Sequence, residues 1–302
     1  MSWIILFSSL IAMIFGAEWL IRGCVRMAKR IGVSEFIVSV IIIGLGTTAP
    51  EILVSILSSA KGYGGLAVGN AIGSNIIRIL GIFGIGVLLH PVVVDFQKRK
   101  LELYFVLLSA VVMMWTIVDG TISKFDGMVL IFIFIAYIIA KKIKSSQEIN
   151  KIKKEYIHPY KIIMPLIAGL FGLYLGSKYF MNALEAIAFT YNLDERIMGI
   201  FIVAPGTSIP ELLVTIIAAL KKRTGIVLGN ILGANIINIS LAVGAAAIVA
   251  PLTVSKYIIS FDIWVMIGMT ALFFFQMSIE KKISRFTGGF YIILLGLYFY
   301  LV

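Results

Sequence analysis

The sequence predicts an all-α integral membrane protein, with ten transmembrane helices in two inverted five-helix repeats and broken helices at the midplane. Composition, the number of apolar segments and an internal register predict this fold. Of the 302 residues, 60% are hydrophobic and 14% are charged, and the mean hydropathy is +1.05. Soluble domains are about half apolar and about a quarter charged. Lipid is therefore the expected solvent for most of this chain.

Ten apolar segments follow one another along the chain, separated by short polar links. A helix needs about 20 apolar residues to cross the hydrocarbon core of a bilayer. The segments cover roughly residues 2–21, 36–60, 65–90, 101–118, 125–140, 162–188, 197–220, 225–250, 258–278 and 286–302. We therefore expect a first repeat over residues 1–142, a basic linker over 143–160 and a second repeat over 161–302.

The distribution of Lys and Arg predicts a multi-pass cell-membrane protein with both termini outside. With the N-terminus placed outside, the cytoplasmic loops carry 20 basic residues and the outside loops carry 5. Cytoplasmic loops are enriched in Lys and Arg, so the loop over 141–161 is expected in the cytoplasm. Because the basic residues lie between apolar segments, the net charge of +11 does not indicate nucleic acid as a partner.

Two polar motifs recur after a shift of 160 residues, without a gap. Residues 46–51 (GTTAPE) match residues 206–211 (GTSIPE), and residues 69–78 (GNAIGSNIIR) match residues 229–238 (GNILGANIIN). Each half contains five segments, an odd number, so the second half enters the membrane from the opposite side. Inverted repeats of this kind are typical of secondary transporters, whose substrate site lies near the midplane between the halves.

Each copy of the first motif ends in an acidic residue, Glu51 or Glu211, inside an apolar segment. A carboxylate at this depth is costly unless it faces the protein interior, pairs or binds a cation. One alternative is a structural carboxylate that hydrogen-bonds to a neighbouring helix. The symmetric placement of two such residues in one repeated motif favours a cation site.

The prolines of the motif supply further oxygen ligands. A proline inside a helix leaves a carbonyl of the preceding turn without its partner, and we expect helix breaks at Pro50, Pro205 and Pro210. Hydroxyl groups stand beside these breaks, on Thr47, Thr48, Thr207 and Ser208. Carboxylate, carbonyl and hydroxyl oxygens are the ligands that hard cations prefer. We therefore expect Na⁺ and Ca²⁺ as the bound ions.

The second motif places Ser74 and Arg78 four residues apart, on one helix face, and their counterparts are Ala234 and Asn238. For the four asparagines of this motif, packing and ligation remain equally open; these are Asn70, Asn75, Asn230 and Asn235. Outside the motifs, Glu18 lies four residues before Arg22. This spacing predicts an interfacial ion pair.

The two motifs resemble the paired alpha repeats of the cation/calcium exchanger superfamily, in its sodium/calcium exchanger branch. The resemblance covers both halves, with the alpha motifs at residues 44–80 and 204–240. It implies cation sites between the second, third, seventh and eighth helices, with Glu51 and Glu211 as the central ligands. It further implies ligation by backbone carbonyls around Gly44, Thr47, Ala204 and Thr207, and by the hydroxyls of Thr48, Ser74 and Ser208.

The sequence departs from the family pattern at Arg78, where Asn or Asp is usual, and at Asn238, where Asp is frequent. An arginine stays protonated even when buried, so two carboxylates and one guanidinium leave a net charge of −1. We expect Arg78 to bridge Glu51 and Glu211, to lower the number of bound cations and to weaken divalent binding. The alternative is that Arg78 extends to a membrane face, as long basic side chains do near helix ends.

The sequence thus predicts a secondary active cation antiporter, most simply a Na⁺/Ca²⁺ exchanger working by alternating access. A monovalent or proton-coupled exchanger (Na⁺/H⁺ or Ca²⁺/H⁺) is the alternative that Arg78 raises. A channel is a less apt class, because inverted repeats with broken helices suit alternating access. We expect no enzyme and no cofactor, since neither His90 nor His158 neighbours the glutamate motifs. A complete site within one chain predicts a functional monomer.

Overall fold

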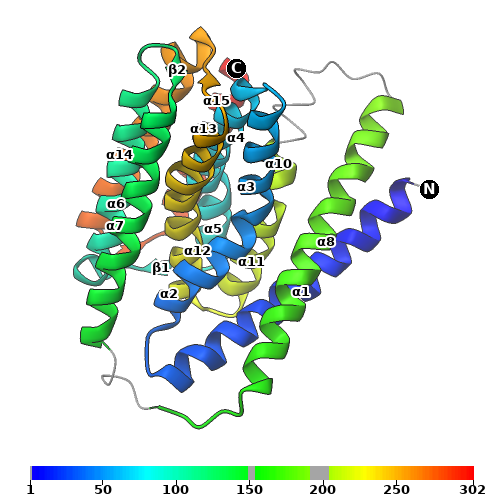
Figure 1. The fold of residues 1–302 in the computed structure, drawn as a ribbon. Coiled ribbons are helices and arrows are strands. Elements are labelled where there is room, and N and C mark those ends of the chain that lie inside the picture. The colour runs from blue at the N-terminus through cyan, green and yellow to red at the C-terminus, as the bar shows by residue number, and fades with distance from the viewer. Residues whose placement is uncertain (1, 149–153, 191–203) are drawn as a thin grey trace.

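The computed structural model describes residues 2–148, 154–190 and 204–302, which form one bundle of helices (Figure 1). The helical segments of the first half are α1 (Ser2–Ile31); α2 (Glu35–Val38), η1 (Ser39–Ile43) and α3 (Gly44–Ala60); α4 (Gly64–Ile77), η2 (Arg78–Phe83) and α5 (Gly84–Leu89); α6 (Phe96–Thr116); and α7 (Lys124–Glu148). Those of the second half are α8 (Tyr160–Thr190); α10 (Ala204–Thr207) and α11 (Ile209–Leu220); α12 (Thr224–Ile236), η4 (Ile237–Val243) and α13 (Gly244–Val249); η5 (Ile258–Asp262) and α14 (Ile263–Ile279); and α15 (Arg285–Leu301).

The ten predicted segments correspond one for one to these helical segments, although residues 197–203 of the seventh lie outside the described part of the chain. Within the described residues, six helices are long and apolar enough to cross a membrane, and α11 and α15 are shorter apolar helices. The helices α6 and α7 carry charged residues at their ends. Helix α7 continues to Glu148, so the first residues of the predicted linker are helical.

The centre of the bundle is formed by two matching segments, Gly64–Leu89 and Thr224–Val249, in which most residues are buried. Both change from α-helix to π-helix within one residue of matching positions, at Arg78 and at Ile237. Helix α3 packs against both central segments, and α11 packs against them from the other half. This packing brings the two copies of each polar motif together in the interior.

The long helices α1 and α8 lie side by side along one flank of the bundle (Figure 1). Glycines allow their backbones to approach closely. A Cβ atom added at Gly16 would lie 2.8 Å from the backbone nitrogen of Leu173, and one added at Gly169 would lie 2.5 Å from that of Leu20. Small residues are the usual means of close helix packing in membranes.

Four strands of two residues each tie the halves together. Strand β1 (Val92–Val93) pairs antiparallel with β4 (Lys282–Ile283), and β2 (Thr121–Ile122) pairs antiparallel with β3 (Leu252–Thr253). Each pair takes one strand from each half of the chain. The described N- and C-terminal helix ends lie at one end of the bundle, and residues 154–159 lie at the other (Figure 1).

The prolines act differently in the two halves. In the second half the chain leaves the helix at Ser208, between α10 and α11, with Pro210 in the first turn of α11. In the first half Pro50 lies inside α3, which runs without interruption from Gly44 to Ala60. The break expected at Pro50 is therefore absent, and a π-turn, η1, directly precedes α3. The second half carries an additional proline, Pro205, in the first turn of α10, where the first half has Leu45.

Candidate cation-binding site

The centre of the site is a buried cluster of three charged side chains from three helical segments. Glu51 on α3, Glu211 on α11 and Arg78 at the start of η2 are each 0% exposed. The Arg78 Nη2 donates to Oε1 of Glu51 at 2.6 Å and to Oε1 of Glu211 at 3.1 Å. Arg78 thus bridges the two carboxylates, as expected, and does not extend to a membrane face.

Two asparagine side chains position Arg78, one directly and one through the other. The Arg78 Nη1 donates to Oδ1 of Asn75 at 3.1 Å, and that oxygen also accepts from Nδ2 of Asn238 at 3.3 Å. The same Nδ2 of Asn238 donates to the carbonyl of Ala71 at 3.2 Å. Asn238 of the second half therefore fixes Asn75 of the first, and Asn75 fixes the guanidinium.

The threonines of the first motif reach the asparagines of the opposite half. The Thr47 hydroxyl donates to the carbonyl of Ile43 at 2.9 Å and lies 3.4 Å from Oδ1 of Asn230. The symmetric contact joins Oγ1 of Thr207 to Oδ1 of Asn70 at 3.5 Å. Asn230 also donates to the carbonyl of Glu211 at 3.1 Å. These contacts fix the backbone beside both carboxylates.

Six buried oxygen atoms in the motifs have no hydrogen-bond partner among the described residues. They are Oε2 of Glu51, Oε2 of Glu211, Oγ1 of Thr48, Oγ of Ser74, and Oδ1 of Asn235 and Asn238. A buried polar atom without a partner costs about 1–3 kcal/mol. Thr48 lies one turn before Glu51 on α3, and Ser74 lies one turn before Arg78, so each shares a helix face with a charged residue of the cluster. Coordination of a hard cation would offset this cost.

The remaining predicted ligand positions lie at the starts of helices. Gly44 begins α3, and a Cβ atom added there would lie 3.3 Å from the backbone of Gly233. Ala204 begins α10, and the buried Ser208 separates α10 from α11. Whether their oxygen atoms coordinate an ion stays a prediction.

The oxygen atoms of the cluster suit a hard cation. No group of three or more His, Cys, Asp or Glu side chains that could hold a metal occurs in the described part of the chain. The two carboxylates are instead supplemented by hydroxyl and carbonyl oxygens. With Arg78 included, the three charged groups sum to −1, and burial strengthens every interaction among them because water screening is weak.

The π-turns are the part of the site that sequence reasoning missed. Turn η2 begins at Arg78, and η4 begins one residue before Asn238. Such turns occur frequently at functional sites, because they redirect side chains within a helix. The surrounding apolar residues give no signal in the sequence that distinguishes a π-turn from an α-turn.

Comparison with known proteins identifies relatives over the whole chain. The model of the sodium/calcium exchanger protein family matches residues 1–142 and 161–302. An uncharacterized membrane protein of Methanocaldococcus jannaschii is 35% identical, over 78% of each chain. The sodium/calcium exchanger MaX1 of Methanosarcina acetivorans is 27% identical over 99% of each chain. The inner membrane protein YrbG of Escherichia coli is 29% identical over 89% of this chain and 86% of its own.

A solved structure shares the fold. The sodium-calcium exchanger NCX_Mj, soaked with Na⁺ and Sr²⁺, superposes with a TM-score of 0.88 at 28% identity, covering 99% of this chain and 97% of its own. The doubled motifs, the broken helices and the buried carboxylate pair thus occur on a known transporter fold. The chain belongs to the sodium/calcium exchanger protein family, and it is a multi-pass membrane cation antiporter, not an enzyme.

Proposed function

We propose that this chain exchanges Na⁺ for Ca²⁺ by alternating access, with Glu51 and Glu211 as the central ligands and Arg78 in the place of one cation. The observation that carries this proposal is the bridge from Arg78 to both carboxylates, at 2.6 and 3.1 Å. A guanidinium there supplies permanently one of the positive charges that neutralise the acids. The number of bound cations is then lower than in a site with two unbridged carboxylates.

The ligands proposed around this pair are oxygen atoms of the two alpha motifs, residues 44–80 and 204–240. They comprise the backbone around Gly44, Thr47, Ala204 and Thr207 and the hydroxyls of Thr48, Ser74 and Ser208, with Asn238 at the edge of the site. The unpartnered oxygens of Thr48 and Ser74 support this assignment. The relatives named as sodium/calcium exchangers support the choice of ions.

A second candidate is monovalent or proton-coupled exchange (Na⁺/H⁺ or Ca²⁺/H⁺) at the same site. The hydrogen bonds that Arg78 makes to both carboxylates favour it, because a net charge of −1 matches one monovalent cation or one proton. A divalent ion would have to displace the guanidinium or share the carboxylates with it. The two candidates therefore differ in what Arg78 does when Ca²⁺ arrives.

The proposed movement is a sliding of α1 and α8, the first and sixth membrane helices, against the remaining bundle. Their position along one flank and the glycines at their contact support this (Figure 1). We further propose that residues 1–142 and 161–302 are the two repeats, that both termini lie outside the cell membrane, and that the loop over 141–161 is cytoplasmic. The site lies within one chain, which supports a functional monomer.

The test is ⁴⁵Ca²⁺ uptake into sodium-loaded liposomes that contain the purified protein, after dilution into sodium-free buffer. We expect uptake that depends on the sodium gradient, disappears in Glu51→Gln and persists in Glu280→Gln, a matched change outside the motifs. Arg78→Asn should raise Ca²⁺ affinity by about tenfold or more, because a unit charge at contact distance contributes several kcal/mol in a buried site.

The contrary outcomes separate the two candidates. Sodium or proton flux without calcium uptake in the wild type would replace calcium exchange by monovalent exchange. If Arg78→Asn left both the Ca²⁺ affinity and the sodium stoichiometry unchanged, the role assigned to Arg78 would be wrong.

A further inference from the structure

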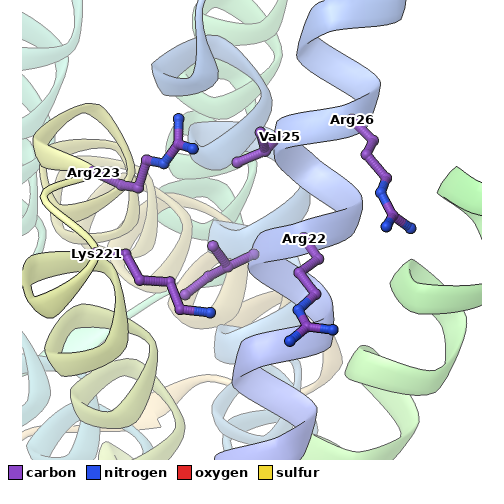
Figure 2. A pocket seen from close by; sticks show the side chains of 6 residues that line it. Arg22, Val25, Arg26, Lys221 and Arg223 are labelled. Atoms are coloured by element: carbon purple, nitrogen blue, oxygen red, sulfur yellow. The ribbon is translucent and has the colours of Figure 1, made fainter. Parts of the chain in front are cut away.

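A second polar feature lies away from the carboxylates, between α1 and the turn that joins α11 to α12. It is a cavity of about 210 Å³ (Figure 2), lined by Ile21, Arg22, Val25, Arg26, Lys221 and Arg223. In Figure 2, Lys221 and Arg223 extend from the turn toward α1, which carries Arg22, whereas Arg26 extends from α1 on the opposite side, toward α8. Four of the six lining side chains are therefore basic, and they come from the two halves of the chain.

Acidic neighbours neutralise only part of this charge. Glu18 accepts from Nη2 of Arg22 at 2.6 Å and from Nζ of Lys221 at 2.8 Å. Glu35 pairs with Arg223. Four cations against these two carboxylates leave two positive charges around the cavity. The ion pair that the spacing of Glu18 and Arg22 predicts is present, and Lys221 joins it from the opposite half.

The basic side chains keep exposed surface and N–H donors with which they can bind a ligand. Arg22, Lys221 and Arg223 have 54%, 39% and 43% of their side-chain surface exposed. The Arg26 Nη1 donates to the carbonyl of Lys161 at 2.8 Å, which anchors that guanidinium at the start of α8. A guanidinium has five N–H donors, so these contacts leave others to a further acceptor.

The surplus of two charges and the planar donors point to a phosphate group. A phosphate monoester carries about −1.5 to −2 charges near neutral pH and three strong acceptor oxygens. Arginine forks bind such oxygens two at a time. Ile21 and Val25 add an apolar side to the cavity, and basic pockets between membrane helices are known to bind phosphorylated lipid headgroups.

We propose that this cavity binds a phosphate group, carried by a lipid headgroup or free in solution, and that the bound phosphate links α1 to the α11–α12 turn. This binding site is separate from the cation site and does not depend on which ions are exchanged. A phosphate held by Arg22 on α1 and by Lys221 and Arg223 on the turn would fix the position of α1. The position of α1 would then respond to the anion content of its surroundings.

Calorimetric titration of the delipidated protein in a zwitterionic detergent tests this. The probes are a short-chain phosphatidic acid below its micellar concentration, a short-chain phosphatidylcholine and inorganic phosphate. We expect phosphatidic acid to bind and phosphatidylcholine not to bind. The double change Arg22→Gln/Lys221→Gln should weaken binding by roughly 10- to 30-fold, because each basic residue near a membrane surface contributes to the attraction of anionic lipid.

Two further variants keep the test decisive. Lys281→Gln/Lys282→Gln removes the same charge from exposed residues near β4, which do not line the cavity, and should leave binding unchanged. Glu18→Gln removes a competing carboxylate and should tighten binding by roughly fivefold, a gain that a misfolded protein would not show.

The outcomes also identify the source of the phosphate. Equal affinity for inorganic phosphate and phosphatidic acid would indicate a soluble anion, and a much higher affinity for phosphatidic acid would indicate a lipid headgroup. The proposal is overturned if neither probe binds the wild type. It is also overturned if both double variants weaken binding equally, or if Glu18→Gln has no effect.

Discussion

At the scale of single residues, a second buried ion pair accompanies the one at the candidate site. Glu102 on α6 pairs with Lys141 on α7, and their side chains are 0% and 4% exposed. The ammonium group of Lys141 lies 4.7 Å from the centre of the Phe36 ring, and Cζ of Arg99 lies 3.6 Å from the same centre. The sequence predicts Lys141 in a cytoplasmic loop, but its side chain is buried within α7 and lies against Phe36 in α2.

The pair of Glu102 and Lys141 should affect stability mainly when only one of its two charged partners is removed. We expect Lys141→Met to lower the free energy of unfolding by about 3–5 kcal/mol, because it leaves a buried carboxylate without its cation. The double change Glu102→Leu/Lys141→Met should recover most of this loss. Thermal unfolding in detergent measures both. Equal losses in the single and double variants would show that packing, not the unpaired charge, determines the cost.

The sequence predicts the residues of the candidate site better than it predicts their contacts. Glu51 and Glu211 are identified by their matching positions in the two repeats and by the free-energy cost of a carboxylate inside the membrane. Arg78 is identified because its counterpart in the second repeat is Asn238. The hydrogen bond from Asn238 to Asn75 depends on how η4 and α4 lie against each other, which no local pattern specifies. The ion pair of Glu102 and Lys141 was missed for the same reason, since a separation of 39 residues carries no periodic signal.

At the scale of helices, hydropathy finds each membrane segment but not its internal irregularities. The ten predicted segments are confirmed, because burying about 20 apolar residues leaves a strong signal. The π-turns in η1, η2 and η4 leave none, since they change the hydrogen-bond register without changing composition. The expectation that proline interrupts a helix is met in the second half, where the helix breaks at Ser208, two residues before Pro210. It is wrong in the first half, where Pro50 lies inside the uninterrupted helix α3.

The contact between α1 and α8 should be sensitive to a single methyl group. We expect Gly169→Ala to destabilise the protein by about 1–3 kcal/mol, because the added carbon would meet the backbone of α1 and force the helices apart. The control is Gly268→Ala on α14, where an added Cβ atom meets nothing within 4 Å. It should be neutral or slightly stabilising. Thermal unfolding of both variants checks the difference, and a tolerated Gly169→Ala would argue against a tight seam.

At the scale of the whole molecule, the alternation of helices places the two described ends of the chain at one end of the bundle (Figure 1). The orientation of that end relative to the cell is a separate matter, and the 20 to 5 split of basic residues predicts that it faces outward. The turn after α3, which holds Lys61, lies near this end, because a Cβ atom added at Gly64 would lie 2.7 Å from the backbone nitrogen of Thr253 in β3, and β3 pairs with β2 there (Figure 1). Strand β4, which holds Lys282, pairs with β1, which lies toward the opposite end (Figure 1).

Cysteine labelling in intact cells should confirm this sidedness. The only cysteine, Cys24, is buried and can be replaced by serine. In that background, Lys61→Cys should react with a membrane-impermeant maleimide, because the distribution of basic residues predicts that its loop faces outward. Lys282→Cys should react only after the cells are permeabilised. The reverse pattern would invert the topology and would place the phosphate cavity on the outer face.

The two short strand pairs have a consequence for the origin and biosynthesis of the chain. Since β1 and β2 find their partners only in the second half, the nascent first half carries two strands with unpaired backbone groups until the ribosome has made β3 and β4. Unpaired strands recruit other strands. A half-length ancestor would have satisfied them with a second copy inserted in the opposite orientation. Fusion of two such copies would require a connecting segment, but no new pairing between these strands.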